Sequence, residues 1–196
     1  MSGMSGMSGM SGGRVIGVVG PSGAGKDSVM RALAAAQPRI HLVRRVITRA
    51  ESAGGEDFDA VTPQEFARRR DAGAFALHWR AHGLSYGIPA EIADRSAGGA
   101  TCLVNLSRSV LPEAEQRFPG FVTLHLTAPP AVLAARLGAR GREDAADIAT
   151  RLARASCALP EGLGRVVMLE NAGPLAETVQ NGLAALQLER VRRCTR

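Results

Sequence analysis

The residues with the most evident chemistry form one run near the start of the chain, Gly20-Pro21-Ser22-Gly23-Ala24-Gly25-Lys26. This run fits the pattern G-x-x-x-x-G-K, in which the N–H groups of a glycine-rich loop point at a phosphate and the lysine reaches the β- and γ-phosphates. Lys26 is the only lysine among the 24 Lys and Arg residues, and a compact ammonium suits a tight anion site better than a planar guanidinium. We therefore predict a site for a nucleoside triphosphate rather than an ordinary glycine-rich turn.

The residue after the lysine departs from the usual pattern. A Ser or Thr commonly stands there and binds Mg²⁺ through its hydroxyl, whereas this chain has Asp27 followed by Ser28. A carboxylate oxygen is also a good ligand for Mg²⁺, so we favour Asp27 and Ser28 as the metal ligands. The alternative is that Asp27 only stabilises the first turn of its helix through its negative charge.

The segments around this loop predict how it is held. A β-branched run over 15–19 precedes the loop, a helical segment over 29–36 follows it, and strands and helices then alternate up to a closing helix over 175–191. This order predicts an α/β fold, a P-loop NTPase with a central parallel sheet flanked by helices and joined by right-handed crossovers. Ligands bind beyond the carboxyl ends of such strands, where Thr48-Arg49 follow a predicted strand over 40–47.

The rest of the chain divides into a tail and one domain. Residues 1–12 repeat Met-Ser-Gly four times and cannot bury a core, so we predict a disordered tail there and a single domain over 13–196. A predicted hairpin around His82-Gly83 belongs to an acceptor-binding subregion at about 48–98. An arginine-bearing loop and helix at about 138–158 predict a helical lid.

Composition excludes several classes of protein. No apolar run is long enough to span a bilayer, and the start lacks the features of a signal peptide, so we expect a cytoplasmic protein without a membrane partner. The net charge of +6 would suit a nucleic acid, but the chain has one Trp, one Tyr and five Phe and no basic run interleaved with aromatic residues. We therefore expect no nucleic-acid partner. The sequence leaves a homodimer open.

The sequence resembles the guanylate kinase group over about residues 14–186. The resemblance rests on the phosphate loop, on Thr48-Arg49, on the hairpin motif Phe75…His82-Gly83…Tyr86-Gly87, and on Arg136-Leu137…Arg140-Gly141…Arg151-Leu152. Several positions that bind the base or the acceptor phosphate in that group differ, however. Leu77 stands where guanylate kinases have a glutamate, Asn105-Leu106-Ser107 replaces an Asp-x-Asp, Phe58 replaces a phosphate-binding tyrosine, and Ser52 replaces a second arginine. Without the glutamate, the edge of a guanine base would be left unpaired.

The same departures occur in the ribose 1,5-bisphosphate phosphokinase family, which this chain also resembles through Gly25-Lys26-Asp27-Ser28, Val104-Asn105-x-Ser107-Arg108 and Arg140-Gly141-Arg142-Glu143. The resemblance implies transfer of the γ-phosphate of ATP to ribose 1,5-bisphosphate, which gives 5-phosphoribosyl 1-diphosphate (PRPP) and ADP in phosphonate catabolism. It also implies Mg²⁺ as the metal. Because Leu77 would line the acceptor pocket, we expect Leu77→Glu to spare ATP binding and to impair use of the sugar.

The resemblance assigns roles to particular residues. The nucleotide would be bound by the phosphate loop, by Asp27 and Ser28 and, on the adenine side, by Asn171. The substrate-binding residues would be Arg49, Glu56, Asp57, Tyr86, Asn105, Ser107, Arg108 and Arg151. Lys26, Arg49, Arg140 and Arg142 would be catalytic, with Arg151 and Arg154 in the lid.

Other interpretations of these residues stay open. Tyr86 suits the core of its hairpin, Arg108 suits a pair with Glu113, and Arg151 and Arg154 suit a surface helix. The run Arg68-Arg69-Arg70 is best explained as a solvated helix face. For the whole chain, the alternatives are a nucleoside monophosphate kinase and a catalytically silent binding module of the guanylate kinase type.

Overall fold

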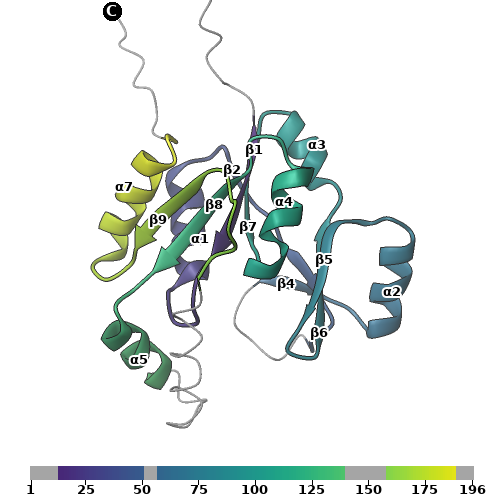
Figure 1. Ribbon diagram of the computed structural model, residues 1–196, viewed down its shortest axis with the longest axis horizontal. Helices are drawn as coiled ribbons and strands as arrows, with labels where there is room; N and C mark the ends of the chain where they lie inside the picture. The colour runs from purple at the N-terminus through teal and green to yellow at the C-terminus, as the bar shows by residue number, and fades with distance from the viewer. Residues whose placement is uncertain (1–12, 51–56, 140–157, 189–196) are drawn as a thin grey trace, which may run out of the picture.

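A five-stranded parallel sheet forms the centre of the larger part of the molecule (Figure 1). The computed structural model describes residues 13–50, 57–139 and 158–188. The sheet order is β2-β7-β1-β8-β9, with β1 Arg14–Val19, β2 Ile40–Leu42, β7 Thr101–Asn105, β8 Val122–Thr127 and β9 Val166–Glu170. All four strand pairs in it are parallel, which confirms the predicted α/β class.

Helices cover both faces of this sheet, each over its own hydrophobic cluster. On one face α1 (Lys26–Ala36) and α7 (Leu175–Ala185) pack against β1 residues such as Ile16 and Val18. On the other face α3 (Ile92–Ala97) and α4 (Leu111–Arg117, entered through the short 3-10 helix η2, Arg108–Val110) pack against Val15 and Val19. The alternation along β1 therefore divides its side chains between two cores, as expected for a central strand.

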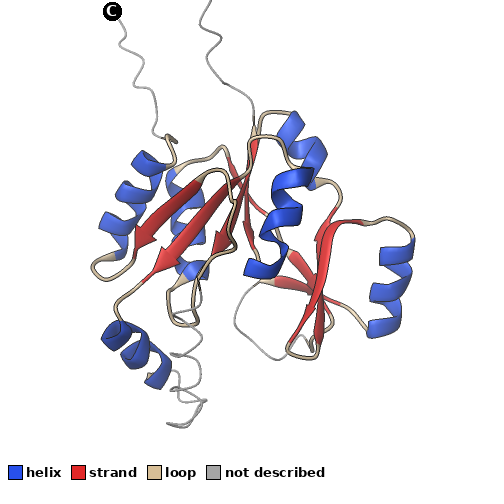
Figure 2. Ribbon diagram, in the orientation of Figure 1, coloured by secondary structure: helices blue, strands red, loops and turns tan. Residues whose placement is uncertain are grey.

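A second, four-stranded sheet forms the smaller part (Figure 2). Its order is β4-β3-β6-β5, with β3 Arg45–Ile47, β4 Phe58–Ala60, β5 Phe75–Ala81 and β6 Leu84–Pro89. The hairpin β5-β6 turns at His82 and Gly83, whose φ angles of 52° and 76° suit a tight two-residue turn. Helix α2 (Pro63–Asp71) covers one face, where Phe66 stacks on Phe75.

Two element boundaries differ from the sequence predictions. The strand predicted over 40–47 is two strands, β2 in the large sheet and β3 in the small one, because Ile40 and Val46 are buried in different cores. The closing helix ends at Ala185 rather than 191. The chain turns there through Gln187, with φ of 54°, and the N–H of Leu188 donates to the carbonyl of Leu183, as in a Schellman motif.

No helix within residues 13–50, 57–139 and 158–188 is both long enough and apolar enough to cross a membrane.

Candidate active site

The glycine-rich loop joins the end of β1 to the start of α1 in the predicted position. Close contacts explain its glycines: a Cβ on Gly20 would lie 2.2 Å from the carbonyl oxygen of Leu126, and Gly25 has a left-handed φ of 84°. The ammonium of Lys26 donates to the carbonyls of Gly20 at 2.9 Å and Pro21 at 3.1 Å. The lysine is thus held over its own loop, in a position from which it can follow a phosphate.

A buried amide fixes the loop from behind. The Nδ2 of Asn171, a residue just after β9 with 5% exposure, donates to the carbonyl of Ala24 at 2.8 Å. Its Oδ1 accepts from the hydroxyl of Thr178 on α7 at 3.1 Å. A Cβ on Gly25 would lie 2.7 Å from the same Nδ2, so only glycine fits there. The nucleotide contact of Asn171 stays a prediction, and the structure adds a role in holding the loop.

Asp27 lies in the first turn of α1, half-buried, and Ser28 beside it is exposed. Its position agrees with stabilisation of the helix start. Among the described residues, no three His, Cys, Asp or Glu side chains gather as a metal site. A Mg²⁺ ion here would fit one carboxylate and one hydroxyl together with phosphate oxygens of the nucleotide, the usual manner in which kinases hold it.

Arg136 is a site residue to which the sequence analysis gave no role. It lies on α5 (Pro130–Gly138), and its Nη1 would be 3.9 Å from a Cβ on Gly25. That Nη1 is buried and, within the described part of the chain, has no hydrogen-bond partner. A buried guanidinium N–H without a partner is costly, so a ligand acceptor beside the loop would stabilise it. The only sequence signal was its place in the motif Arg136-Leu137.

Two of the predicted acceptor residues belong to the smaller part, Tyr86 on β6 and Arg49 just after β3. The carbonyl of Ser85 accepts from the N–H of Thr48 at 3.0 Å, and the N–H of Ser85 donates to the hydroxyl of Thr48 at 2.8 Å. These bonds fix the chain just before Arg49, whose guanidinium lies over the ring of Phe58, 5.8 Å from its centroid. Tyr86 is half-buried and stacks on Trp79 with centroids 5.2 Å apart, so it has part of the core role considered above.

Leu77 corrects one expectation. It is 1% exposed and belongs to the hydrophobic cluster that joins the hairpin to the large sheet, together with Ile88, Val104 and Leu106. The position at which guanylate kinases read the base is therefore part of the core here. A glutamate at 77 would bury an unpaired carboxylate, so Leu77→Glu is expected to disrupt the fold itself.

The last residue of β7 and the segment after it bring three more predicted residues to the carboxyl edge of the large sheet. Asn105 pairs in register with Val18, two residues before the loop. Ser107 caps the 3-10 helix η2 through its hydroxyl, which accepts from the N–H of Ser109. Arg108 begins η2, and burial and then the positive charge of Arg108 lower the pKa of His125 on β8. Three of the predicted substrate-binding residues thus lie at the carboxyl end of β7, beside the strand that leads into the loop.

The remaining predicted residues either lie outside the described residues or have a different contact from the one predicted. Glu56, Arg140, Arg142, Arg151 and Arg154 lie outside the described residues, and so does most of the predicted lid. Asp57 is exposed and forms an ion pair with Arg44 at 3.1 Å, a contact that the sequence did not predict.

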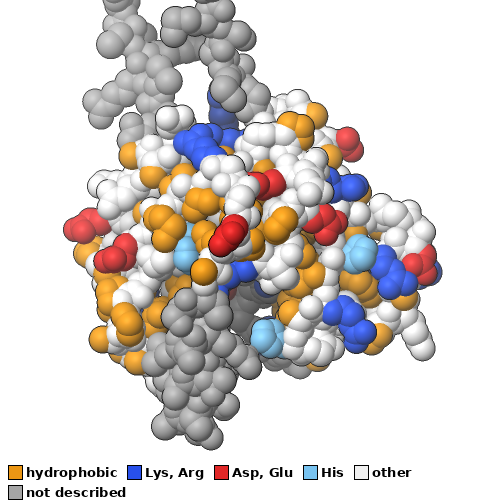
Figure 3. All heavy atoms as spheres, viewed as in Figure 1, with side chains coloured by type: hydrophobic (Ala, Val, Ile, Leu, Met, Phe, Trp, Pro, Cys, Tyr) orange, Lys and Arg blue, Asp and Glu red, His pale blue; other side chains and the backbone are white. Residues whose placement is uncertain are grey.

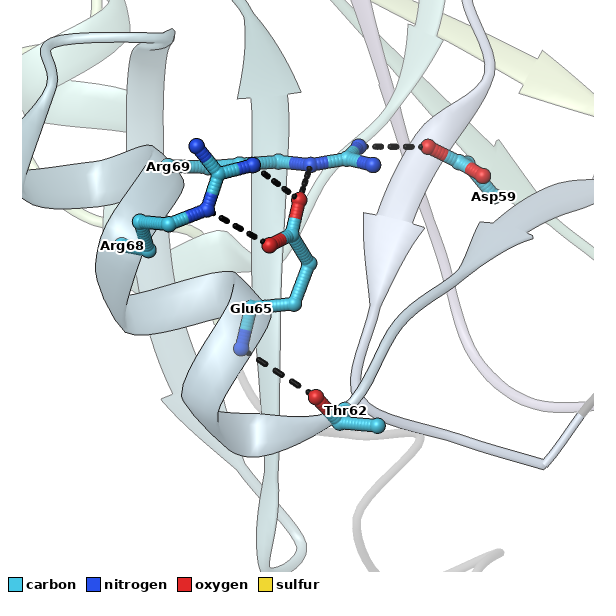
Figure 4. Close-up of polar contacts among 5 residues, drawn as sticks. All are labelled: Asp59, Thr62, Glu65, Arg68 and Arg69. Atoms are coloured by element: carbon cyan, nitrogen blue, oxygen red, sulfur yellow. Dashed lines mark hydrogen bonds and ion pairs between the residues drawn. The ribbon is translucent and has the colours of Figure 1, made fainter.

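The arginine run on α2 is part of a surface network, as interpreted from the sequence (Figure 4). Glu65 accepts from Arg68 and Arg69, and Arg69 also pairs with Asp59 at 2.7 Å. Thr62 caps the helix by accepting from the N–H of Glu65, but the Glu65 carboxylate turns to the arginines and does not complete a capping box. Basic and acidic side chains lie next to each other along this edge of the molecule (Figure 3).

Comparisons with known proteins agree with this geometry. The chain matches no family profile. It is 54% identical over 178 residues to a ribose 1,5-bisphosphate phosphokinase PhnN of a Ruegeria species, covering 91% of this chain and 94% of that protein. It is 50% identical over 184 residues to the protein of the same name from Pseudomonas fluorescens, covering 89% and 95%.

Solved structures show the same fold. Guanylate kinase from Anaplasma phagocytophilum superposes with a TM-score of 0.62 at 20% identity, covering 94% of this chain and 89% of that one. A gluconokinase from Sinorhizobium meliloti superposes with a TM-score of 0.51 at 26% identity, covering 90% and 92%. With a P-loop kinase fold and close relatives of one name over nearly its whole length, the chain belongs to the ribose 1,5-bisphosphate phosphokinase family.

Proposed function

We propose that the protein transfers the γ-phosphoryl group of ATP to the 1-phosphate of ribose 1,5-bisphosphate, which gives PRPP and ADP. The observation that carries the proposal is 54% identity to a relative of that name over 91% of the chain. The buried Leu77 supports it, because an apolar core residue at the position of the base-reading glutamate leaves a guanine edge without that partner.

The reaction needs positioning and charge neutralisation more than proton transfer. An oxygen of the acceptor phosphate is already anionic at neutral pH and attacks the γ-phosphorus, while the bond to the β-phosphate oxygen breaks and ADP leaves. The loop amides and Lys26 would hold the β- and γ-phosphates. Arg49 and Tyr86 would hold the acceptor phosphate in line with the γ-phosphate. Asn105, Ser107 and Arg108 would bind the remaining polar groups of the sugar.

Further charges would act around the transferred group. Arg136 is suited to an acceptor group of the nucleotide, and Arg140 and Arg142 would neutralise charge in the transition state. Asp27 and Ser28 would hold Mg²⁺, which when bound supplies further neutralisation of the phosphates. We also propose a cytoplasmic role in phosphonate catabolism, with Glu56, Asp57 and Arg151 as weaker substrate contacts.

The test compares two acceptors with purified full-length protein. ³¹P NMR follows ADP and diphosphate product from ATP with ribose 1,5-bisphosphate, and a coupled ADP assay measures GMP. We expect turnover of the sugar bisphosphate and kcat/KM for GMP lower by about 100-fold or more, the usual cost of unpaired polar groups in a specific site. Faster turnover of GMP would establish a monophosphate kinase instead, and undetectable ATP binding would indicate a silent binding module.

A further inference from the structure

We propose that Arg45 binds the non-reacting 5-phosphate of the acceptor, a role that no sequence motif assigns to it; this inference rests on the proposed function. The proposal starts from a need for charge. A bisphosphate acceptor carries phosphates at two positions, and each requires its own cationic partner. Arg49 serves one of them, whereas the second arginine of guanylate kinases is Ser52 in this chain.

Arg45 lies on the same face of the small sheet as the other acceptor residues. It pairs in register with Phe58 of the neighbouring strand β4, so the two side chains share a face. Its guanidinium lies over the ring of Tyr86, 5.1 Å from the centroid, and 5.9 Å from the centroid of Trp79. Each arginine therefore has a cation–π contact, Arg49 with Phe58 and Arg45 with the Trp79–Tyr86 pair.

This face is directed at the large sheet and not at bulk solvent. Trp79 and Tyr86 pack on the cluster that contains Leu106 and Val110, the residues that flank Ser107 and Arg108. The opposite face of the small sheet is covered by α2, where Phe66 and Phe75 stack. Arg45 consequently lies on the side from which the residues after β7 approach.

These cation–π contacts suit both arginines to phosphate binding. A ring beside a guanidinium stabilises its positive charge, and the planar fork of N–H donors matches the oxygens of a phosphate. The aromatic support also limits the rotamers available, so less entropy is lost when a phosphate binds. Arg49 lies four positions after Arg45, so their Cα atoms are roughly 13 Å apart at most, and two such long side chains can both reach one small ligand.

The experiment varies the protein and the acceptor together. Steady-state kinetics are measured for wild type and Arg45→Gln with ribose 1,5-bisphosphate and with ribose 1-phosphate, which lacks the 5-phosphate. We expect Arg45→Gln to raise KM for the bisphosphate by about 10- to 100-fold, the range for a hydrogen bond to a charged group. KM for ribose 1-phosphate and for ATP should change less than about threefold.

Two further variants control for folding. Arg80→Gln changes an exposed arginine on β5 of the same sheet and should leave both acceptors unaffected. Arg45→Lys keeps the charge and should retain part of the preference for the bisphosphate, which provides a second measurement if Arg45→Gln melts early. An equal loss with both acceptors, or no loss with either, would overturn the role of Arg45. Absence of sugar turnover in wild type would instead overturn the proposed function.

Discussion

The nucleotide half and the acceptor half of the candidate active site differ in whether backbone or side-chain groups form them. The nucleotide half is a backbone loop, stabilised by one lysine and by the buried pair Asn171 and Thr178. The proposed acceptor half is a set of side chains from separate segments, in which Arg45 and Arg49 have cation–π contacts with aromatic rings. Backbone N–H groups fit the phosphates of any nucleoside triphosphate, whereas side chains on a small sheet can change without loss of the loop. The comparison explains how a guanylate kinase fold accommodates a sugar bisphosphate.

The largest expected effect is a loss of folding stability at Leu77, which packs between the hairpin and the large sheet. Leu77→Glu should prevent stable folding, with a loss of about 4 kcal/mol or more, because it buries an unpaired charge in the cluster between hairpin and large sheet. Thermal melts and urea unfolding measure the loss. The matched control is His78→Glu, one residue along on the exposed face, which should unfold like wild type. A folded Leu77→Glu protein with normal ATP affinity would show that position 77 borders an open pocket after all.

Lys26→Ala should be the most damaging change that leaves the fold intact. Removal of one charge aimed at the transferred phosphates is expected to lower kcat by roughly 10²–10³ or more. Arg31→Ala removes an exposed cation from the same helix and should have no comparable effect. Equal melting temperatures for both variants would show that the loss lies in catalysis. Near-normal turnover of Lys26→Ala would remove the loop from the reaction.

Thr178→Val tests whether the hydrogen bonds from Thr178 to Asn171 and from Asn171 to Ala24 hold the phosphate loop in place. The change deletes the hydroxyl that fixes Asn171 and should weaken ATP binding by about fivefold, the equivalent of one hydrogen bond of about 1 kcal/mol, with KM for the sugar unchanged. Thr123→Val is the matched control, since the buried hydroxyl of Thr123 has no partner within the described residues. Thr178→Ser should restore ATP affinity. The same loss in both Val variants would indicate general destabilisation.

Sequence reasoning succeeded in one half more than in the other, for a physical reason. The strand, the glycines and Lys26 of the phosphate loop are adjacent in the chain. Their spacing alone therefore predicts a P-loop fold and a nucleotide phosphate as the ligand. The partners of that loop are not local, because Thr178 comes from the last helix and Arg136 from α5. The sequence also did not predict that Arg45 lies in the small sheet, because the single strand predicted over 40–47 is in fact two strands, β2 and β3, in different sheets. A short apolar run does not show in which of two cores it will be buried.

The smallest expected effect lies outside both halves, on α2. Hydrogen bonds from Arg68 and then Arg69 lower the pKa of Glu65 to about 2, from an ordinary 4.5. A lowered pKa means that the ionised form stabilises the fold above pH 4.5, and that this contribution is lost as the pH falls towards 2.

Glu65→Gln should therefore be slightly less stable than wild type at pH 7, and the difference in urea midpoint should shrink steadily below pH 4.5. Because Arg68 is exposed and Glu65 and Arg69 are partly exposed, 1 M salt should also reduce the difference. A difference that stayed constant over pH and salt would mean that Glu65 contributes through packing on α2 and not through its charge.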